Sequence, residues 1–538
     1  MILKNYVIVQ QKRVPFQNFY RKNKGCDSQT YLQYKNLNNS GGSMVEIFVD
    51  GAPIQVDESK NLIDALHENG IEIPHFCYHS ELSVVGMCRI CLIEIEGNPK
   101  YQAACNTAIQ AGMKIIVNSD KVKKAREGVM EFLLINHPLD CPVCDKSGEC
   151  QLQNYSFSVG GSTTRYKEVK RNIPQEKIGT NLLINHNRCI LCYRCVRFDK
   201  EKVGEHDLEF VSRGNDTIIA YTPPEGSGKS LLDHNYQGSL ADICPVGALL
   251  NENTLFKSRV WWYKQEQSIC HGCSSLCNVT TNERDGIIHR YMPPEAPEKN
   301  GFFLCDKGRF SSPQFSESRL LRYLVNGEQQ KFTSFQDDLI EKLSNASSTL
   351  VIGGATESCE SHASISEVSS AENITWEFRT EDYMWENKFQ DKVDFLLSVD
   401  QRPNSASLLK NDKAKSLSAK NDLIDALEKA DHIIVLNEFS APYAFDAKEP
   451  SSLEDNKLFQ LFQEKGLWSK TIVFSTHESK ATELAAYSMP VQSFVEQSAT
   501  YIDKKGQEKR SKMILPAPKG LLTSGDLLKS LIKSAVPA

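Results

Sequence analysis

The sequence predicts an α+β part that binds metal, followed by an α/β part. Two observations support this fold class. Of the 17 cysteines, all but the isolated Cys26 and Cys359 lie between Cys77 and Cys305, mostly in closely spaced groups. Beyond about residue 320, cysteines are nearly absent and short apolar runs alternate with helix-like stretches. That alternation is typical of a parallel sheet covered on both faces.

The bulk composition excludes several classes of protein. A chain of 538 residues can form several domains with a substantial core. Its 62 Lys and Arg and 68 Asp and Glu give a net charge of -6, which argues against nucleic acid as the main partner. No apolar run approaches the roughly 18 residues that span a bilayer. Cysteines this closely spaced rarely form disulfides, so we expect bound metal in a reducing compartment.

The first segment, residues 1–43, is basic, shows no periodicity and ends in NNSGGS. Two interpretations remain open. The segment is a disordered, transit-like arm, or translation starts at Met44. Neither gives Cys26 a role in metal binding.

Residues 44–120 predict a small mixed fold of the β-grasp type. Two alternating runs flank Asp50-Gly51, which is a hairpin signal. A short helix follows over residues 58–70, with Gly70 as its stop, and strand-like runs return at residues 90–97 and 114–117. The first group of candidate ligands lies in this region and fits a [2Fe–2S] centre, since the expected fold resembles plant-type ferredoxin with a longer first gap between cysteines. The first group consists of Cys77, Cys88, Cys91 and Cys105.

Residues 121–165 carry the stretch HPLDCPVCDKSGEC, which has only three cysteines. The preceding residues 121–137 keep a helical period, Ser119 or Asp120 can cap that helix, and Pro138 prevents its continuation. His137 is therefore expected at the helix end. Imidazole is a competent iron ligand, so His137 supplies the missing fourth donor. The second group consists of His137, Cys141, Cys144 and Cys150.

Two further groups each combine a close triplet with one remote cysteine. The third group consists of Cys189, Cys192 and Cys195 in RCILCYRC and Cys244 in DICPVGAL. The fourth group consists of Cys270, Cys273 and Cys277 in ICHGCSSLC and Cys305 in FLCDKGRF. Structural zinc sites usually present two separated pairs, whereas such triplets are typical of cubane iron–sulfur clusters. We therefore predict iron–sulfur clusters, with zinc as the alternative.

Beyond residue 320, four apolar runs predict the parallel strands: TLVIGG, DFLLSVD, DHIIVLNEF and KTIVFSTHES. No glycine-rich dinucleotide or P-loop motif follows them, although Gly353-Gly354 ends the first run. No catalytic constellation is visible, so we expect no substrate-transforming site and no catalytic residues. His271, between two candidate ligands, is expected to donate a hydrogen bond to a cluster sulfur.

These motifs resemble the large iron–sulfur subunit, of type G, that occurs in bacterial NADH:quinone oxidoreductase (respiratory complex I). The resemblance runs from about Val45 to the C-terminus and is most specific at HPLDCPVCDKSGEC, RCILCYRC, DICPVGAL, ICHGCSSLC and FLCDKGRF. The family's ligands match all sixteen positions of the four groups. The fourth group occurs in some bacterial members, and the resemblance implies that it lies off the main electron route.

The same resemblance implies a domain order. Residues 1–43 form an extension or a wrongly assigned start, 44–120 a β-grasp [2Fe–2S] domain and 121–165 a helical His-Cys₃ [4Fe–4S] domain. Residues 166–262 form a ferredoxin-like [4Fe–4S] domain and 263–319 a molybdopterin-oxidoreductase-type [4Fe–4S] domain. Residues 320–538 are similar to a shortened, degenerate molybdopterin-oxidoreductase α/β domain, for which we expect no molybdopterin.

The implied function is electron transfer through one [2Fe–2S] and three [4Fe–4S] clusters, from a flavin-containing NADH-oxidising subunit toward quinone. Implied partners are that subunit and other peripheral-arm iron–sulfur subunits, with membrane contact only through the complex and no nucleic acid. The implied location is peripheral, on the cytoplasmic side of a bacterial inner membrane. The alternatives are an iron–sulfur subunit of a formate dehydrogenase or NAD-linked hydrogenase.

Overall fold

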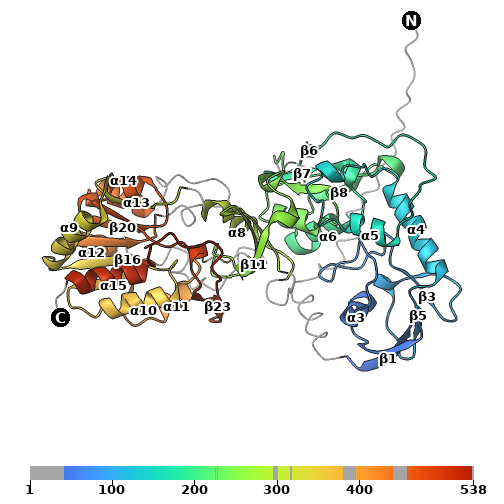
Figure 1. Cartoon of the computed structure of the whole chain (residues 1–538), viewed down its shortest axis with the longest axis horizontal. Coiled ribbons are helices and arrows are strands. Elements are labelled where there is room, and N and C mark those ends of the chain that lie inside the picture. Colours follow the sequence, from blue (N-terminus) through green and yellow to red (C-terminus); the bar gives the residue numbers. More distant parts are fainter. Residues whose placement is uncertain are drawn as a thin grey trace, which may run out of the picture. The chain divides into compact units, whose positions relative to one another are not determined.

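The computed structural model describes residues 42–223, 226, 228–294, 301–315, 318–379, 396, 398, 400, 402–417, 420–439 and 457–535. Residues 1–41, including Cys26, lie outside the described residues. The two interpretations of residues 1–43 therefore concern a segment that is mostly not described. The described chain folds into two compact units (Figure 1). The first contains the residues up to His75 and Val84–Val129, and the second contains Phe76–Ser83 and everything from Met130 onward.

The first unit is built on a five-stranded sheet of order β2-β1-β5-β3-β4. Its strands are Met44–Val49 (β1), Ala52–Asp57 (β2), Leu92–Ile95 (β3), Gln102–Ala103 (β4) and Lys114–Ile116 (β5). β1 and β2 pair antiparallel across Asp50 and Gly51, whose φ angles of 49° and 87° suit a tight hairpin turn. The predicted hairpin is confirmed. β1 pairs parallel with β5, so the sheet is mixed.

Two helices follow the predicted pattern. α3 (Leu62–Glu68) begins where Asn61 accepts a hydrogen bond from the backbone of Ile63, and its apolar side chains are buried. α4 (Asp120–Leu134) begins at Ser119, whose hydroxyl accepts a hydrogen bond from the backbone of Val122 at 3.1 Å. α4 ends three residues earlier than expected. Pro138 accounts for this end, because its ring would clash with the Leu134 carbonyl in a continued helix and it disfavours helical backbone at His137.

Short elements separated by irregular chain make up the second unit as far as residue 315. Three sheets lie here, of order β10-β7-β6, β8-β9 and β11-β12-β13. The strands are Glu176–Lys177 (β6), Leu182–Ile184 (β7), Leu208–Val211 (β8), Ile218–Tyr221 (β9), Leu249–Asn251 (β10), Lys264–Ile269 (β11), Asn278–Arg284 (β12) and Ile287–Met292 (β13). The helices are Gln151–Val159 (α5), Arg194–Phe198 (α6), Gln237–Ile243 (α7) and Asp306–Phe310 (α8).

The remaining residues form an α/β layer structure around an eight-stranded sheet of order β15-β14-β21-β20-β19-β16-β17-β18. The strands are Tyr323–Val325 (β14), Glu328–Gln330 (β15), Thr349–Gly353 (β16), Ile374–Arg379 (β17), Ala414–Leu417 (β18), His432–Leu436 (β19), Thr471–Ser475 (β20) and Tyr487–Pro490 (β21). β16 to β21 pair parallel with one another, whereas β14 pairs antiparallel with both β21 and β15. The short hairpin Thr500–Ile502 (β22) and Glu508–Arg510 (β23) lies outside this sheet.

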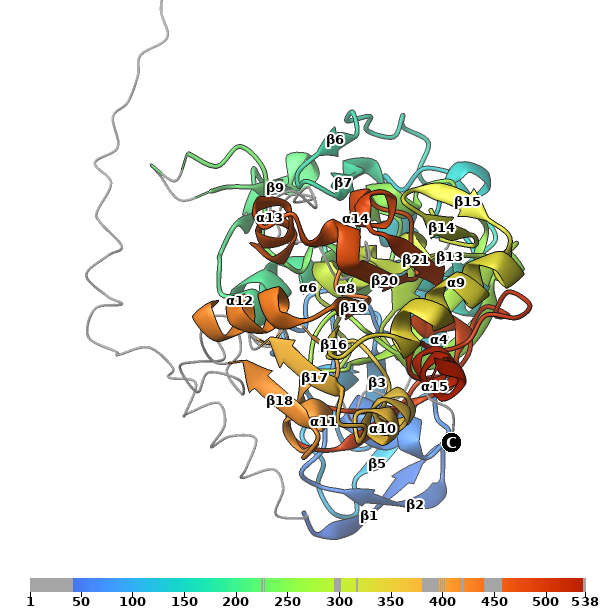
Figure 2. The ribbon, with the colours of Figure 1, turned by 90° about the vertical axis from the view of Figure 1, so that its left-hand side faces the viewer.

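Helices cover both faces of this sheet (Figure 2). Alternate strand residues divide between the two faces, as a pleated sheet requires. Val351 and Ile434 pack with α9 (Phe332–Ser344), α10 (Cys359–Val368) and α15 (Ser524–Ala535). Ile352 and Val435 pack with α12 (Lys420–Lys429), α13 (Lys457–Glu464) and α14 (Lys480–Leu484). α11 (Ser405–Leu409) directly precedes β18 in the chain.

Three of the four predicted parallel strands are confirmed, as β16, β19 and β20. The fourth, DFLLSVD at residues 394–400, lies mostly outside the described residues. Within the described ranges, no helix has the length and apolarity that crossing a bilayer requires.

Candidate metal centres

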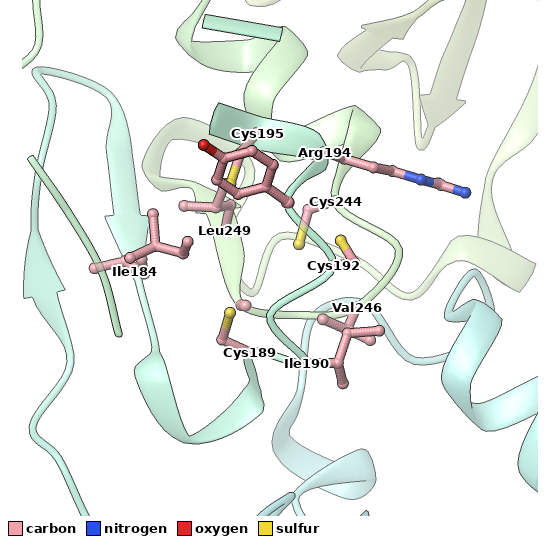
Figure 3. Close-up of a pocket in the computed structure, with 12 residues that line it drawn as sticks. Ile184, Cys189, Ile190, Cys192, Arg194, Cys195, Cys244, Val246 and Leu249 are labelled. Atoms are coloured by element: carbon pink, nitrogen blue, oxygen red, sulfur yellow. The ribbon is translucent and has the colours of Figure 1, made fainter. Parts of the chain in front are cut away.

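The third group surrounds one cavity of the second unit. All four cysteines line this cavity, together with apolar side chains such as Ile184, Val246 and Leu249. Their thiols turn toward the shared space (Figure 3). The structure therefore brings together the four residues that the spacing grouped: Cys189, Cys192, Cys195 and Cys244.

The backbone between these thiols is bent by left-handed residues. Leu191 and Tyr193 have φ angles of 53° and 69°, a conformation that costs roughly 1–2 kcal/mol for a residue with a side chain. These bends let thiols three positions apart face the same space. The Leu191 N–H also points at the Cys189 Sγ at 3.4 Å. Hydrogen bonds of this kind tune the potential of a cluster held by the sulfur.

The fourth group lines a second cavity with the same construction. Cys270, Cys273, Cys277 and Cys305 face it, together with Leu276, Tyr291 and Leu396. Leu276 is left-handed, with a φ of 45°, and the Gly272 N–H points at the Cys270 Sγ at 3.4 Å. A Cβ on Gly308 would lie 2.3 Å from that same sulfur. Gly308 is therefore required for the Cys270 thiol to reach its place.

The α/β part of the chain closes over the fourth group. The Ser274 backbone donates to the Asp400 carbonyl at 3.1 Å, and the Ser275 hydroxyl donates to the Leu396 carbonyl at 2.8 Å. The Lys504 N–H donates in turn to the Ser274 carbonyl at 2.9 Å. The loop between Cys273 and Cys277 is thus bonded to chain segments far along the sequence.

The arrangement of the thiols suits a cluster better than a single ion. Burial raises the pKa of Cys189 and Cys270 to about 12, so bound metal must displace protons from them. A tetrahedral zinc ion needs thiolates about 3.8 Å apart, because Zn–S bonds are about 2.3 Å long. A cubane has iron at four separate corners, so a cavity lined by four cysteines offers one ligand for each corner.

The three cysteines of the second group also lie together. Cys144 and Cys150 are buried, whereas Cys141 is exposed. Burial raises the pKa of the Cys144 thiol, and the nearby Cys141 raises it further. Burial likewise raises the pKa of Cys150, with an added effect from Cys144.

His137 has the chemistry that a fourth ligand requires. Burial lowers its pKa to about 4, so the imidazole is neutral at physiological pH. Its Nδ1 is buried and has no hydrogen-bond partner in the described part of the chain. His137 and Cys144 share Arg188 and Asp140 as charged neighbours. A neutral ring with an unbonded nitrogen, close to Cys144, fits metal ligation.

Two arginines that sequence reasoning missed fix the loop of the second group. Arg259 donates to the Cys144 carbonyl at 2.6 Å and also to the Pro142 carbonyl. Arg188 forms an ion pair with Asp140 at 2.9 Å. Nothing in the local sequence marks these arginines, because each acts on a loop far from it along the chain.

The second and third groups share a wall. A Cβ on Gly247, in the CPVG turn after Cys244, would lie 2.3 Å from the Cys144 Sγ. The Gln151 N–H, next to Cys150, donates to the Pro245 carbonyl at 3.0 Å. Residues just after Cys244 therefore lie against ligand positions of the second group.

The first group is divided between the two units. Cys88, Cys91 and Cys105 belong to the first unit, where the Ala104 N–H donates to the Cys91 carbonyl at 2.9 Å. Cys77 lies in Phe76–Ser83, which belongs to the second unit. Its carbonyl accepts a hydrogen bond from Arg197. The joint ligation of one cluster by all four cysteines stays a prediction.

His271 packs against aromatic side chains and is not among the residues that line the fourth cavity. Its ring stacks on Phe494 at 3.9 Å between centroids and meets Tyr501 edge-on at 5.3 Å. The expected hydrogen bond from His271 to a cluster sulfur stays a prediction. The aromatic pocket was not foreseen because both partners lie more than two hundred residues further along the chain.

The α/β part has the strand order in which a ligand-binding crevice forms, between β16 and β19 at their carboxyl ends. Here the chain's own side chains fill that place. The buried Glu357 accepts hydrogen bonds from Asn437 at 2.6 Å and Ser524 at 2.9 Å. Glu438 pairs with Arg402 at 2.7 Å and packs against Gly353. Two buried carboxylates and one arginine do not fit the anionic phosphate of a molybdopterin.

Four family models match successive parts of the chain. Residues 42–120 match a 2Fe-2S iron-sulfur cluster binding domain, and residues 126–165 match the NADH-ubiquinone oxidoreductase-G iron-sulfur binding region. Residues 179–250 match the ferredoxin-like domain of NADH-quinone oxidoreductase subunit 3, and residues 263–315 match the molybdopterin oxidoreductase Fe4S4 domain.

Three relatives are 38% to 41% identical to this chain over the aligned residues. The NADH-ubiquinone oxidoreductase 75 kDa subunit of Reclinomonas americana is 39% identical over 54% of this chain and 42% of its own length. The iron-sulfur protein 1 of mitochondrial NADH dehydrogenase [ubiquinone] from Solanum tuberosum is 38% identical over 55% and 40%. The type-G subunit of NADH-quinone oxidoreductase from Rickettsia conorii is 41% identical over 52% and 41%.

The resemblance predicted from the motifs is confirmed over the part of the chain that carries the cysteine groups. The matches span less than half the length of each of these relatives. A chain from a crystal structure of NAD⁺-reducing [NiFe]-hydrogenase is 28% identical, with a TM-score of 0.36, and covers 40% of this chain and 91% of that chain.

Proposed function

We propose that this chain is an electron-transfer subunit of an NADH:quinone oxidoreductase of the complex I type. The first group holds one [2Fe–2S] cluster, and the other three groups hold one [4Fe–4S] cluster each. Iron–sulfur clusters take up and release single electrons. The observation that carries the proposal is the pair of cavities lined by four cysteines each, in a chain whose relatives are named as subunits of this enzyme.

Contacts in the second unit support a series of neighbouring sites. Arg194, beside Cys195, donates to the Tyr78 carbonyl at 2.6 Å, so the segment that carries Cys77 is held next to the third group. Gly247 in turn places the third group against Cys144 of the second. Within the second unit, the order of neighbours is therefore the segment that carries Cys77, the third group and the second group. This order differs from the order of the groups along the sequence.

The proposed partners are the flavin-containing subunit that oxidises NADH and other iron–sulfur subunits of the peripheral arm. The chain would lie on the cytoplasmic side of a bacterial inner membrane and reach the membrane only through the complex. No molybdopterin is expected, because Glu357 and Glu438 occupy the crevice between β16 and β19. The domain boundaries predicted from the sequence belong to this proposal.

Elemental analysis of the anaerobically purified chain tests the proposal. One [2Fe–2S] and three [4Fe–4S] clusters contain about 14 iron atoms and as many labile sulfides. Cys192→Ser is the matched variant and should lower the iron content by about four atoms. Stoichiometric zinc would contradict the proposal. Stoichiometric molybdenum would favour the formate dehydrogenase alternative instead.

A further inference from the structure

The helix that delivers Cys244 has an unusual N-terminal cap. α7 runs from Gln237 to Ile243 and ends at Cys244, and the preceding Tyr236 makes no side-chain hydrogen bond to the helix. The N–H groups of Gln237 and Gly238 donate instead to the two carboxylate oxygens of Asp306, each at 2.8 Å. A carboxylate at this place satisfies unpaired donors and favours the helix dipole. Asp306 directly follows Cys305 of the fourth group.

The backbone on both sides of Cys305 is bonded to the same end of α7. The Asp306 N–H donates to the Asn235 carbonyl at 2.7 Å. On the other side, the Ser239 hydroxyl donates to the Leu304 carbonyl at 2.7 Å, and the Leu304 N–H lies 3.1 Å from the same hydroxyl. Cys305 is therefore held between two residues that are fixed to the start of α7.

A second contact holds the other end of the helix. The buried Arg309 forms an ion pair with Asp242 in the last turn of α7 and donates to the Tyr291 carbonyl at 2.8 Å. A Cβ on Gly238 would lie 2.2 Å from the Arg309 side chain. α7 thus lies against α8 along its length, and α8 begins at Asp306.

These contacts connect the remote ligand of one group to the remote ligand of another. A helix of seven residues is about 10 Å long and nearly rigid. Any displacement of its first turn is therefore carried to Cys244 at its end. The triplet Cys189, Cys192 and Cys195 has no comparable contact with α8 among the hydrogen bonds of the described residues.

We propose that Asp306 is a positioning residue, which caps α7 so that the Cys244 thiol meets the triplet of the third group. The placement of Cys305 then sets the placement of Cys244, so the fourth group acts on the third through these contacts. This inference rests on the proposed function, since it presumes a cluster in the third group.

The test compares variants of the full-length, anaerobically prepared chain by electron paramagnetic resonance and redox titration. Cys192→Ser first identifies the signal of the third group, as the one it removes. Asp306→Ala should then lower that signal at least twofold or shift its midpoint potential, while the signal of the second group persists. Asp306→Asn keeps one acceptor oxygen and should recover part of the third-group signal that Asp306→Ala loses.

Two further variants keep the test decisive. Ser239→Ala removes the bridge to Leu304 without touching a ligand or the cap, and should cause a smaller shift of the same signal even if Asp306→Ala does not fold. Ser358→Ala is the matched control. It removes the side-chain cap of α10, where Ser358 accepts a hydrogen bond from Ser361 at 3.1 Å, and should leave the third-group signal unchanged.

An unchanged third-group signal and potential in both Asp306→Ala and Ser239→Ala would overturn the inference. So would an equal loss in Ser358→Ala, because the effect would then follow general destabilisation. If the parent chain itself shows no iron–sulfur signal, the proposed function fails instead. The two failures are therefore distinguishable.

Discussion

The third group and the fourth group each combine a triplet with one remote cysteine, and in both a glycine follows that cysteine three residues later. Gly247 and Gly308 both leave room for a thiol at 2.3 Å from a notional Cβ. The thiol beside Gly247 is that of Cys144, which belongs to a different group, the second. The thiol beside Gly308 belongs to the same group, as Cys270. One local pattern thus joins two sites in the first case and completes a single site in the second.

The chain segments that surround the third and fourth groups also differ. The third group shares its wall with the second and lies beside the segment that carries Cys77. The fourth group is closed by Leu396, Asp400 and Lys504 of the α/β part. The third group thus adjoins other cysteine groups, whereas the fourth is enclosed by the α/β part.

Gly247→Ala should have the largest effect on the metal content. Its Cβ would overlap the Cys144 sulfur, and overpacking of this kind costs about 1–3 kcal/mol even where the chain can shift. Because the two groups share this wall, both [4Fe–4S] clusters should be disturbed, with a loss of up to about eight of about 14 iron atoms. Iron analysis after anaerobic reconstitution measures the loss.

Gly128→Ala provides the matched control for that substitution. Gly128 lies within α4, where a Cβ would meet nothing within 4 Å. This variant should retain the full iron content. A Gly247→Ala chain with intact second-group and third-group signals would break the comparison, because the two sites would then not share a wall.

Gly308→Ala should have a smaller and more local effect. Its Cβ would overlap the Cys270 sulfur of the same group, so only the fourth cluster should be lost, about four iron atoms. Electron paramagnetic resonance should still detect the second-group and third-group signals. Loss of the second-group signal in this variant would contradict the isolation of the fourth group.

These glycines also show where sequence reasoning stops. The third and fourth groups, the first hairpin, α3 and three parallel strands could be predicted, because each depends on spacing or periodicity in the sequence. Which thiol faces Gly247 depends on the packing of two loops far apart in the chain. The cap joins Asp306 to Gly238 and Gln237, which precede it by 68 and 69 positions in the sequence. The one signal that could have been found is Cys-x-x-Gly, which occurs after Cys244 and after Cys305.

The α/β part limited prediction in a different way. Gly353-Gly354 suggested no ligand, and the structure gives these glycines a packing role, because a Cβ on Gly353 would lie 2.8 Å from Glu438. No local pattern could show that residue 438 returns to the end of β16. The end of α4 at Leu134 could have been predicted more closely, because Pro138 excludes a helical bond to the Leu134 carbonyl although the apolar period continues past it.

Acidification should have the smallest effect of these changes, and it should act on the stability of the α/β part. Burial lowers the pKa of His362 in α10 to about 4, and its Nε2 lies 2.7 Å from the Gly354 carbonyl. The unfolded chain takes up a proton near pH 6.5 and the folded chain only near pH 4. The stability that neutral His362 provides is therefore complete above pH 6.5 and is lost progressively toward pH 4, by about 3 kcal/mol at most.

The measurement is the midpoint of thermal unfolding of the α/β part between pH 7 and pH 4.5, for the parent and for His362→Gln. The parent should lose more stability on acidification than the variant. Asp400 acts in the opposite direction, because burial raises its pKa to about 6, so only the difference between the two proteins is informative. Equal pH profiles would exclude His362 as the source. Release of fourth-group iron before third-group iron on acidification would strengthen the comparison.

The position of α15 has a consequence for biosynthesis. This helix, Ser524–Ala535, packs into the same core as α9, α10 and Phe474 of β20. A chain emerging from the ribosome has therefore made every ligand of the four groups before the α/β core can close, since domains fold as their last elements arrive. The cysteines of the fourth group remain reachable for most of the remaining synthesis. The segments that close over the fourth group, around Leu396, Asp400 and Lys504, are synthesised only after all four of its cysteines.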